Sequence, residues 1–309
     1  MLQAFRSSGD LLADRRYGYA RAAYEERDYG AAADLARQAL ELAPDFAAAH
    51  ALLGRAALAA GHPDEAAAAL ERALALEPDD PHGVRVDLAR LGRGSPEAAL
   101  AAPYVRALFD DYAPRFERHL VRNLNYRGPD LLADALRRAA VKRFRAPSFA
   151  RALDLGCGTG LMGRALAGAV GALEGVDLSP RMLAQAAKTR LYDALHEGDL
   201  AGFLRSRPAA SADLVVAADV FVYLADLAAV FAETRRVLER GGLFAFTVQA
   251  HEGAGVVLGE DARYAHGEPL LRGLARKAGL AIVLFERVST REDRGEPVPG
   301  FLVVAESGG

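Results

Sequence analysis

The chain has 309 residues, 51% of them apolar and 26% charged, and its formal net charge is −3. This composition is typical of packed globular domains and excludes a disordered or fibrous chain, and the length predicts two domains. The single cysteine, Cys157, excludes an internal disulfide framework and a multi-cysteine metal site, and we expect no metal. No apolar run reaches the ~18 residues of a membrane span and no secretory signal is recognisable, so we expect a cytoplasmic protein.

Basic residues are concentrated in one part of the chain. Only the segment 93–150 has a net positive charge, with 11 basic and 6 acidic residues, and its arginines are interspersed with apolar residues at helical spacing. A nucleic-acid-binding domain usually presents a basic face over the whole domain. We therefore expect neither nucleic acid nor a membrane as a partner.

An internal repeat occupies the amino-terminal part of the chain. Residues 13–46 align without gaps on residues 47–80, which gives a period of 34 residues. In each unit, apolar residues recur at helical spacing up to a proline, Pro44 or Pro78, that ends the helix. In the second unit Gly54 marks a place where two helices approach closely. The period and the pattern resemble tetratricopeptide repeats.

Two repeats are fewer than the ~3 that usually form a stable array. We therefore expect the repeats to pack on the rest of the chain, to self-associate, or to bind a peptide or protein partner. A capping helix is expected at 84–91, and amphipathic helices at 102–120 and 131–144 follow a linker rich in glycine and proline. The expected divisions are a repeat domain (1–92), a linker with pre-core lid helices (93–150) and a third part (151–309).

The third part alternates short apolar strands with helices. This alternation predicts an α/β, doubly wound and mainly parallel sheet of the Rossmann-like type, which binds ligands at the carboxyl ends of its strands. A helix at 268–278 and an antiparallel hairpin formed by 281–287 and 300–305 are expected after the last parallel strand. The expected parallel strands are 152–155, 172–176, 214–217 and 243–248, and the helices between them are 161–167, 180–190 and 227–238.

Acids and glycines follow the expected strands. The first loop runs from Asp154 through Gly156 and Gly158 to Gly160, and glycines there permit a tight turn and a close approach of the backbone to a ligand. At the end of the second strand, Asp177 can accept both hydrogen bonds of a ribose diol.

In the third loop Asp199 can accept a hydrogen bond from the amino group of adenine, or can simply cap a helix. After the next strand come Asp219 and Val220, and a Gly-Gly pair precedes the fifth strand. In this order, the motifs resemble those of class I S-adenosylmethionine-dependent methyltransferases. The repeats and the pre-core segment extend the resemblance to bacterial tetratricopeptide-containing methyltransferases over nearly the whole chain.

The resemblance implies S-adenosylmethionine as cofactor, S-adenosylhomocysteine as product, and a role for each motif residue. The implied contacts are the methionine part for Asp154, Gly156, Cys157, Gly158 and Gly160, the ribose for Asp177, the adenine surroundings for Leu178, Met182, Asp199 and Leu200, the sulfonium and acceptor side for Asp219 and Val220, and a lid for Tyr112 and Tyr126.

A nicotinamide-dependent dehydrogenase is the competing class. Residues 158–163 also satisfy the spacing Gly-x-Gly-x-x-Gly of dinucleotide-binding folds. The carboxylate of Asp154 beside this loop would repel a pyrophosphate but suits the ammonium group of a methionine moiety. The charge therefore favours the methyltransferase.

Methyl transfer is a direct displacement at an activated carbon, so alignment of the reactants supplies much of the rate, and a general base matters only where the acceptor needs deprotonation. We favour a small-molecule acceptor. A protein or peptide acceptor recruited by the repeats and a non-catalytic cofactor-binding protein are the alternatives. The catalytic candidates are His266, Asp219 and Tyr223, and the acceptor-binding candidates are Arg263, Tyr264 and His251.

Overall fold

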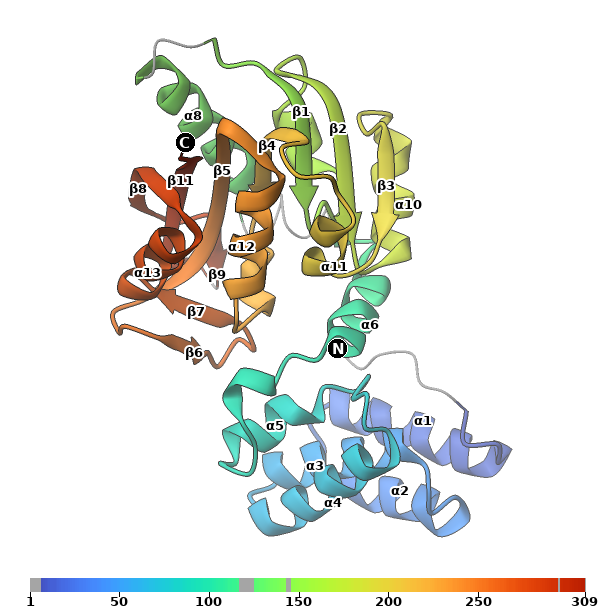
Figure 1. The fold of residues 1–309 in the computed structure, drawn as a ribbon. Coiled ribbons are helices and arrows are strands. Elements are labelled where there is room, and N and C mark those ends of the chain that lie inside the picture. Colours follow the sequence, from blue (N-terminus) through green and yellow to red (C-terminus); the bar gives the residue numbers. More distant parts are fainter. Residues whose placement is uncertain (1–6, 117–124, 143–145, 294, 309) are drawn as a thin grey trace. The chain divides into compact units, whose positions relative to one another are not determined.

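The computed structural model describes residues 7–116, 125–142, 146–293 and 295–308. The chain divides into two compact units, residues 1–111 and 112–309, and each is described by itself (Figure 1). The domain boundaries expected at residues 92 and 150 stay a prediction.

The first unit is built from helix pairs. Asp10 and Asp28 cap the first two helices, because their carboxylates accept backbone N–H groups of the first turn. Buried alanines let the helices pack closely. The helices are α1 (Leu11–Glu25), α2 (Tyr29–Leu42), α3 (Ala47–Ala59), α4 (Pro63–Leu76), α5 (Val84–Arg90), the short 3-10 helix η1 (Pro96–Ala98) and α6 (Ala102–Tyr112), which ends across the boundary between the units.

The close approach expected at Gly54 is confirmed. A β-carbon on Gly54 would lie 2.6 Å from Cγ of Leu70, so α3 and α4 can approach this closely only because α3 has no side chain at this position. A partly buried ion pair joins α3 to α5, with Nε of Arg55 2.7 Å from a carboxylate oxygen of Asp87. The capping helix is thereby bound to the second repeat.

The second unit contains a sheet in the order β3-β2-β1-β4-β5-β11-β8, with β11 antiparallel to both of its neighbours. Parallel pairing from β3 to β5 confirms the expected doubly wound arrangement. The strands are β1 (Phe149–Leu155), β2 (Val170–Asp177), β3 (Ala194–Glu197), β4 (Ala212–Ala217), β5 (Leu238–His251), β6 (Val256–Leu258), β7 (Tyr264–Gly267), β8 (Leu280–Val288), the short pair β9 (Glu292–Asp293) and β10 (Glu296–Pro297), and β11 (Gly300–Ser307).

Helices cover both faces of this sheet (Figure 1). Successive residues of β1 point to opposite faces, so Leu153 and Leu155 join a core with α11, α12 and α13, whereas Ala152 joins a core with α8 and α9. Both faces are therefore buried, as expected for parallel strands. The helices are α8 (Gly128–Lys142), α9 (Leu161–Ala165), α10 (Pro180–Thr189), α11 (Leu200–Arg205), η2 (Phe221–Tyr223), α12 (Ala228–Val237) and α13 (Glu268–Ala278).

Two expectations about local structure were wrong. The helix expected at 102–120 ends at Tyr112, because Pro114 disfavours the helical conformation in the residue before it; residues 117–124 lie outside the described part. Strand β7 (Tyr264–Gly267), which pairs with β5 and β6, is absent from the strands expected from the sequence. Its three or four residues are too few to show a strand period in the sequence.

Within the described ranges, no helix is long and apolar enough to cross a membrane.

Replacing Gly54 with valine should destabilise the repeat unit by about 1–3 kcal/mol, because the new side chain must displace Leu70 and separate α3 from α4. Urea unfolding followed by circular dichroism measures the loss. Gly18→Val is the matched control, because no atom lies within 4 Å of a β-carbon built on helical Gly18. Equal losses in the two variants would contradict the proposed close contact.

Candidate functional site

The glycine loop after β1 is a turn that needs glycine. Gly156, Gly158 and Gly160 all have positive φ angles, of +71°, +53° and +90°. A β-carbon on Gly156 would also lie 2.4 Å from Cγ2 of Val220. The turn therefore packs directly on the residue that follows Asp219, and the loops after β1 and β4 lie together.

Asp177 connects the ends of β1 and β2. One of its carboxylate oxygens accepts the backbone N–H of Gly158 at 2.9 Å, and the other accepts that of Ser179 at 2.9 Å. Asp177 thus positions the glycine turn and is placed at the carboxyl edge of the sheet.

Asp154 is buried at the end of β1. The hydroxyl of Tyr192 donates to one of its carboxylate oxygens at 2.7 Å, while the other, Oδ1, has no hydrogen-bond partner among the described residues. Burial raises the pKa of Asp154 to about 7, the bond from Tyr192 acts in the opposite direction, and the charge of Asp177 raises the pKa further. A buried carboxylate oxygen without a donor fits a cationic or N–H-bearing ligand.

Sequence reasoning missed Tyr192. Its ring fills the space beside three glycines, lying 3.2 Å or less from where a β-carbon of Gly160, Gly163 or Gly175 would be. Its hydroxyl also accepts the backbone N–H of Gly163 at 3.2 Å. The only sequence signal was the small size of these glycines, which does not say which side chain occupies the space.

Asp199 caps α11, where its carboxylate accepts the backbone N–H of Gly202 at 2.7 Å. The helix-cap interpretation is therefore observed, and the adenine contact stays a prediction. Leu200 is buried in the core that contains α11, and Met182 is fully buried, whereas Leu178 is half-buried. Cys157 is buried, and a β-carbon on Gly175 would lie 2.9 Å from its Sγ, so its thiol packs against β2.

A second group of polar side chains surrounds Asp219 at the end of β4. The carboxylate accepts hydrogen bonds from the hydroxyls of Thr247 and Thr290, at 2.9–3.0 Å, and from Arg291 at 3.0 Å. Asp219 has a φ of +53°, a strained conformation for a residue other than glycine. Because these donors occupy its oxygens, the geometry is that of a positioning residue, and its role as a base stays a prediction.

The segment after β8 links this group to the pre-core segment. The backbone N–H of Arg127 donates to the carbonyl of Thr290 at 2.8 Å, and the Asn125 side chain donates to Glu292 at 3.2 Å. Tyr126 lies between them. Burial raises its pKa well above the usual value, and the charges of Asp219 and Asp154 raise it further. Tyr126 is therefore close to the acids of both loops.

Among the predicted residues, Tyr223, Arg263 and Tyr112 lie close together, whereas Tyr264 is buried apart from them. Tyr223 and Arg263 lie together, with Nε of Arg263 donating to the Tyr223 hydroxyl at 3.4 Å. Tyr112 is near enough for Tyr223, Arg263 and Arg115 to influence its pKa, which burial raises. Tyr264, by contrast, is buried in β7 with 2% of its surface exposed.

The two histidines differ in availability. Both ring nitrogens of His251 are occupied within its own loop, by the Gly255 carbonyl at 2.8 Å and the Gly253 N–H at 2.9 Å. His266 is fully buried, and its Nε2 donates to the Leu224 carbonyl at 3.0 Å while Nδ1 has no partner in the described part. Burial lowers the pKa of His266 to about 4, which makes it a weak base at neutral pH.

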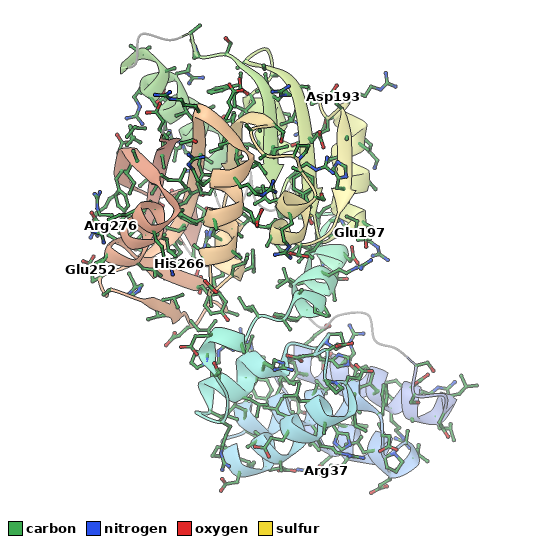
Figure 2. The ribbon with its side chains drawn as sticks, in the orientation of Figure 1. Arg37, Asp193, Glu197, Glu252, His266 and Arg276 are labelled. Carbon is green, nitrogen blue, oxygen red and sulfur yellow. The ribbon has the colours of Figure 1, made fainter. Side chains whose placement is uncertain are left out.

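The residues of the candidate site lie at the edge of the sheet formed by the carboxyl ends of the parallel strands. Figure 2 shows Glu197, at the end of β3, and His266, on β7, toward the same edge, with Asp193, before β3, at the opposite edge. Within the described ranges, no group of three or more His, Cys, Asp or Glu residues is placed to hold a metal ion. The site therefore combines buried acids on the β1 and β2 side with arginines and tyrosines on the β4 side.

Comparison with known families assigns both parts of the chain. Residues 153–246 match a family described as a methyltransferase domain, and residues 23–86 match tetratricopeptide repeats. The chain therefore contains a tetratricopeptide-repeat segment and a segment that matches a methyltransferase domain.

Individual relatives match only part of the chain. A dTDP-3-amino-3,6-dideoxy-α-D-glucopyranose N,N-dimethyltransferase from Streptomyces fradiae is 40% identical over 81 residues, 26% of this chain and 32% of that protein. A malonyl-[acyl-carrier protein] O-methyltransferase from Enterobacter lignolyticus is 32% identical over 148 residues, 47% of this chain and 53% of that protein. The chain thus spans about a third and about half of these relatives.

The structure is also similar to that of the [4+2]-cyclase SpnF, with a TM-score of 0.52 and 19% identity over 66% of this chain and 95% of that one. At this identity the likeness shows the fold alone. Because that protein is a cyclase, the shared fold does not by itself determine the reaction.

Replacing Asp177 with alanine should weaken S-adenosylhomocysteine binding at least about tenfold, because the ribose and the glycine turn both lose hydrogen bonds to a charged acceptor. Calorimetric titration measures the affinity. Asp193→Ala is the control, with unchanged affinity expected, because this carboxylate also accepts a backbone N–H, that of Leu173 at 2.8 Å, but lies at the opposite edge of the sheet (Figure 2). Unchanged affinity in a folded Asp177→Ala protein would contradict the ribose assignment.

The affinity for S-adenosylmethionine should rise about tenfold between pH 6 and pH 8, because Asp154 ionises over this range and its carboxylate then attracts the ammonium group. In Asp154→Asn the pH dependence of the affinity that is due to Asp154 should be absent, and only the dependence due to the ligand's own titration should remain. Calorimetry at several pH values compares the two proteins, and parallel curves would refute the role of Asp154.

Acid should destabilise the protein through His266. Its folded pKa of about 4 lies below the unfolded value of about 6.5, so the unfolded state binds more protons as pH falls between them, and about 2 kcal/mol is lost by pH 5. Urea unfolding from pH 7.5 to 5 measures this loss. His266→Gln, which can keep the donor to Leu224, should flatten the curve; an unchanged slope would contradict the assignment.

Proposed function

We propose that this protein transfers the methyl group of S-adenosylmethionine to a small-molecule acceptor by direct displacement, leaving S-adenosylhomocysteine. The carrying observation is the unpartnered, buried carboxylate oxygen of Asp154 beside the glycine turn and Asp177. These groups match the ammonium, the backbone-contacting chain and the ribose of the cofactor. When bound, the cofactor supplies a methyl group already activated by sulfonium.

The residues of the chain would act mainly by alignment. Gly156 and Gly158 let the backbone approach the methionine part, and Asp177 holds both the turn and the ribose. Val220, packed on Gly156, limits the space at the sulfonium side. Correct alignment of acceptor oxygen, nitrogen, sulfur or carbon with the methyl group accounts for much of the acceleration in such displacements.

Proton removal would have a smaller role. The Asp219 carboxylate is occupied by hydroxyl and guanidinium donors, and His266 is a weak base at neutral pH. Both would therefore chiefly orient the loop after β4, Asp219 through β5 and His266 through the Leu224 carbonyl. An acceptor that is already unprotonated at neutral pH suits such a site.

A protein or peptide acceptor recruited by the repeats is the second candidate. The observation that favours it is the exposed apolar surface of α1, where Leu11, Leu12 and Tyr19 have 86%, 60% and 56% of their surface exposed. Such side chains can bind a partner. The repeats would then deliver the acceptor.

Incubation with tritiated S-adenosylmethionine and a bacterial extract divided by ultrafiltration tests both candidates. We expect label in the fraction below 3 kDa, and its loss with Asp177→Ala. Label confined to macromolecules would instead establish a protein acceptor. Cofactor binding without label in any fraction would favour a non-catalytic binding protein, and binding of NAD alone would overturn the enzyme class.

A further inference from the structure

Arg263 is presented by a tight turn between β6 and β7. The backbone N–H of Gly259 donates to the Arg263 carbonyl at 2.8 Å, and the N–H of Ala262 donates to Gly259 at 3.1 Å. Ala262, directly before the arginine, has a φ of +56°, which is unfavourable for alanine. The chain therefore tolerates local strain where it places this guanidinium.

Within the described ranges, the guanidinium of Arg263 makes one hydrogen bond, to Tyr223. Its Nε bond to Tyr223 is long, at 3.4 Å, and its nearest carboxylate oxygen, on Asp261, is 3.8 Å away, beyond hydrogen-bond distance. The side chain is 29% exposed. An arginine offers five N–H donors, so most of those on this partly buried group are available to a ligand.

A second guanidinium approaches the same carboxylate. Arg291, whose side chain is 4% exposed, lies 3.8 Å from the Asp261 oxygen that also faces Arg263. Asp219 and Gln249 accept from its terminal nitrogens, but its buried Nε has no partner among the described residues. Two arginines thus face one carboxylate that hydrogen-bonds neither of them.

This group lies beside the cofactor loops. Tyr223 and Asp219 belong to the same turn after β4, and the turn touches Gly156 through Val220. The donors of Arg263 are therefore on the acceptor side of the proposed methyl-transfer site. Asp219 and Asp261 balance the two arginine charges, so a ligand would be bound by directed hydrogen bonds and not by net charge.

We propose that Arg263 binds an anionic group of the acceptor, a carboxylate or a phosphate, and that Asp261 competes with that group for the arginine. The inference rests on the proposed function, because it places the anion on the acceptor side. The planar guanidinium can hold two oxygens of either anion at once.

Calorimetric titration of succinate and of inorganic phosphate into the full-length protein saturated with S-adenosylhomocysteine tests the proposal. We expect saturable binding of at least one anion, weakened about tenfold or more by Arg263→Gln and to a smaller extent by Arg263→Lys. Asp261→Asn should strengthen it, because the competing charge is gone. Arg272→Gln, on exposed α13, is the control that should leave it unchanged.

The two anions distinguish a carboxylate from a phosphate acceptor by their relative affinity. Absence of binding by both anions, or equal binding to the wild type and Arg263→Gln, would overturn the proposal. S-adenosylhomocysteine affinity, measured first in every variant, confirms a folded cofactor site. If the wild type does not bind S-adenosylhomocysteine, the proposed function itself is contradicted. This outcome differs from a failure of the anion site, in which S-adenosylhomocysteine binds but the anions do not.

Discussion

The edge of the sheet where β4 and β5 end depends on the contacts of one carboxylate, that of Asp219. This group joins the end of β4 to Thr247 of β5 and to Thr290 and Arg291 after β8. Asp219 is in a strained backbone conformation, and a buried guanidinium needs a partner. Removing one partner of a buried ion pair typically costs about 3–5 kcal/mol, so the strand end and the segment after β8 are held as a unit.

The same segment determines where the pre-core residues lie. Because Thr290 also accepts a hydrogen bond from the Arg127 backbone, the network extends from β5 through Asp219 to the residues beside Tyr126. The acids at the ends of β1 and β2 are held by different contacts. Asp177 is held by backbone N–H groups, whereas Asp154 is buried with one oxygen unpartnered. Carboxylates at the loops after β1 and β2 are thus separated from the guanidinium groups beside the β4 and β7 turns along one edge of the sheet.

Sequence reasoning succeeded where a feature is local. The glycine turn, the acids after β1 and β2, the repeat period and α13 are all encoded within a few consecutive residues, because turn geometry, helical period and chain punctuation act over short distances. It failed for β7, which is too short to show a period and is stabilised by pairing with β5. It also gave Asp199 two roles, of which the structure displays the helix cap.

The sequence by itself determined the class of fold, the repeat array and the acids that line the carboxyl ends of the first strands, since each follows from residue type and spacing. Only the tertiary structure decided the partners of those residues. Tyr192 reaches Asp154 from 38 positions away, and Arg291 reaches Asp219 from 72 positions away. Such contacts arise from strand order and side-chain packing in three dimensions, so they cannot be predicted from the spacing of residues along the chain.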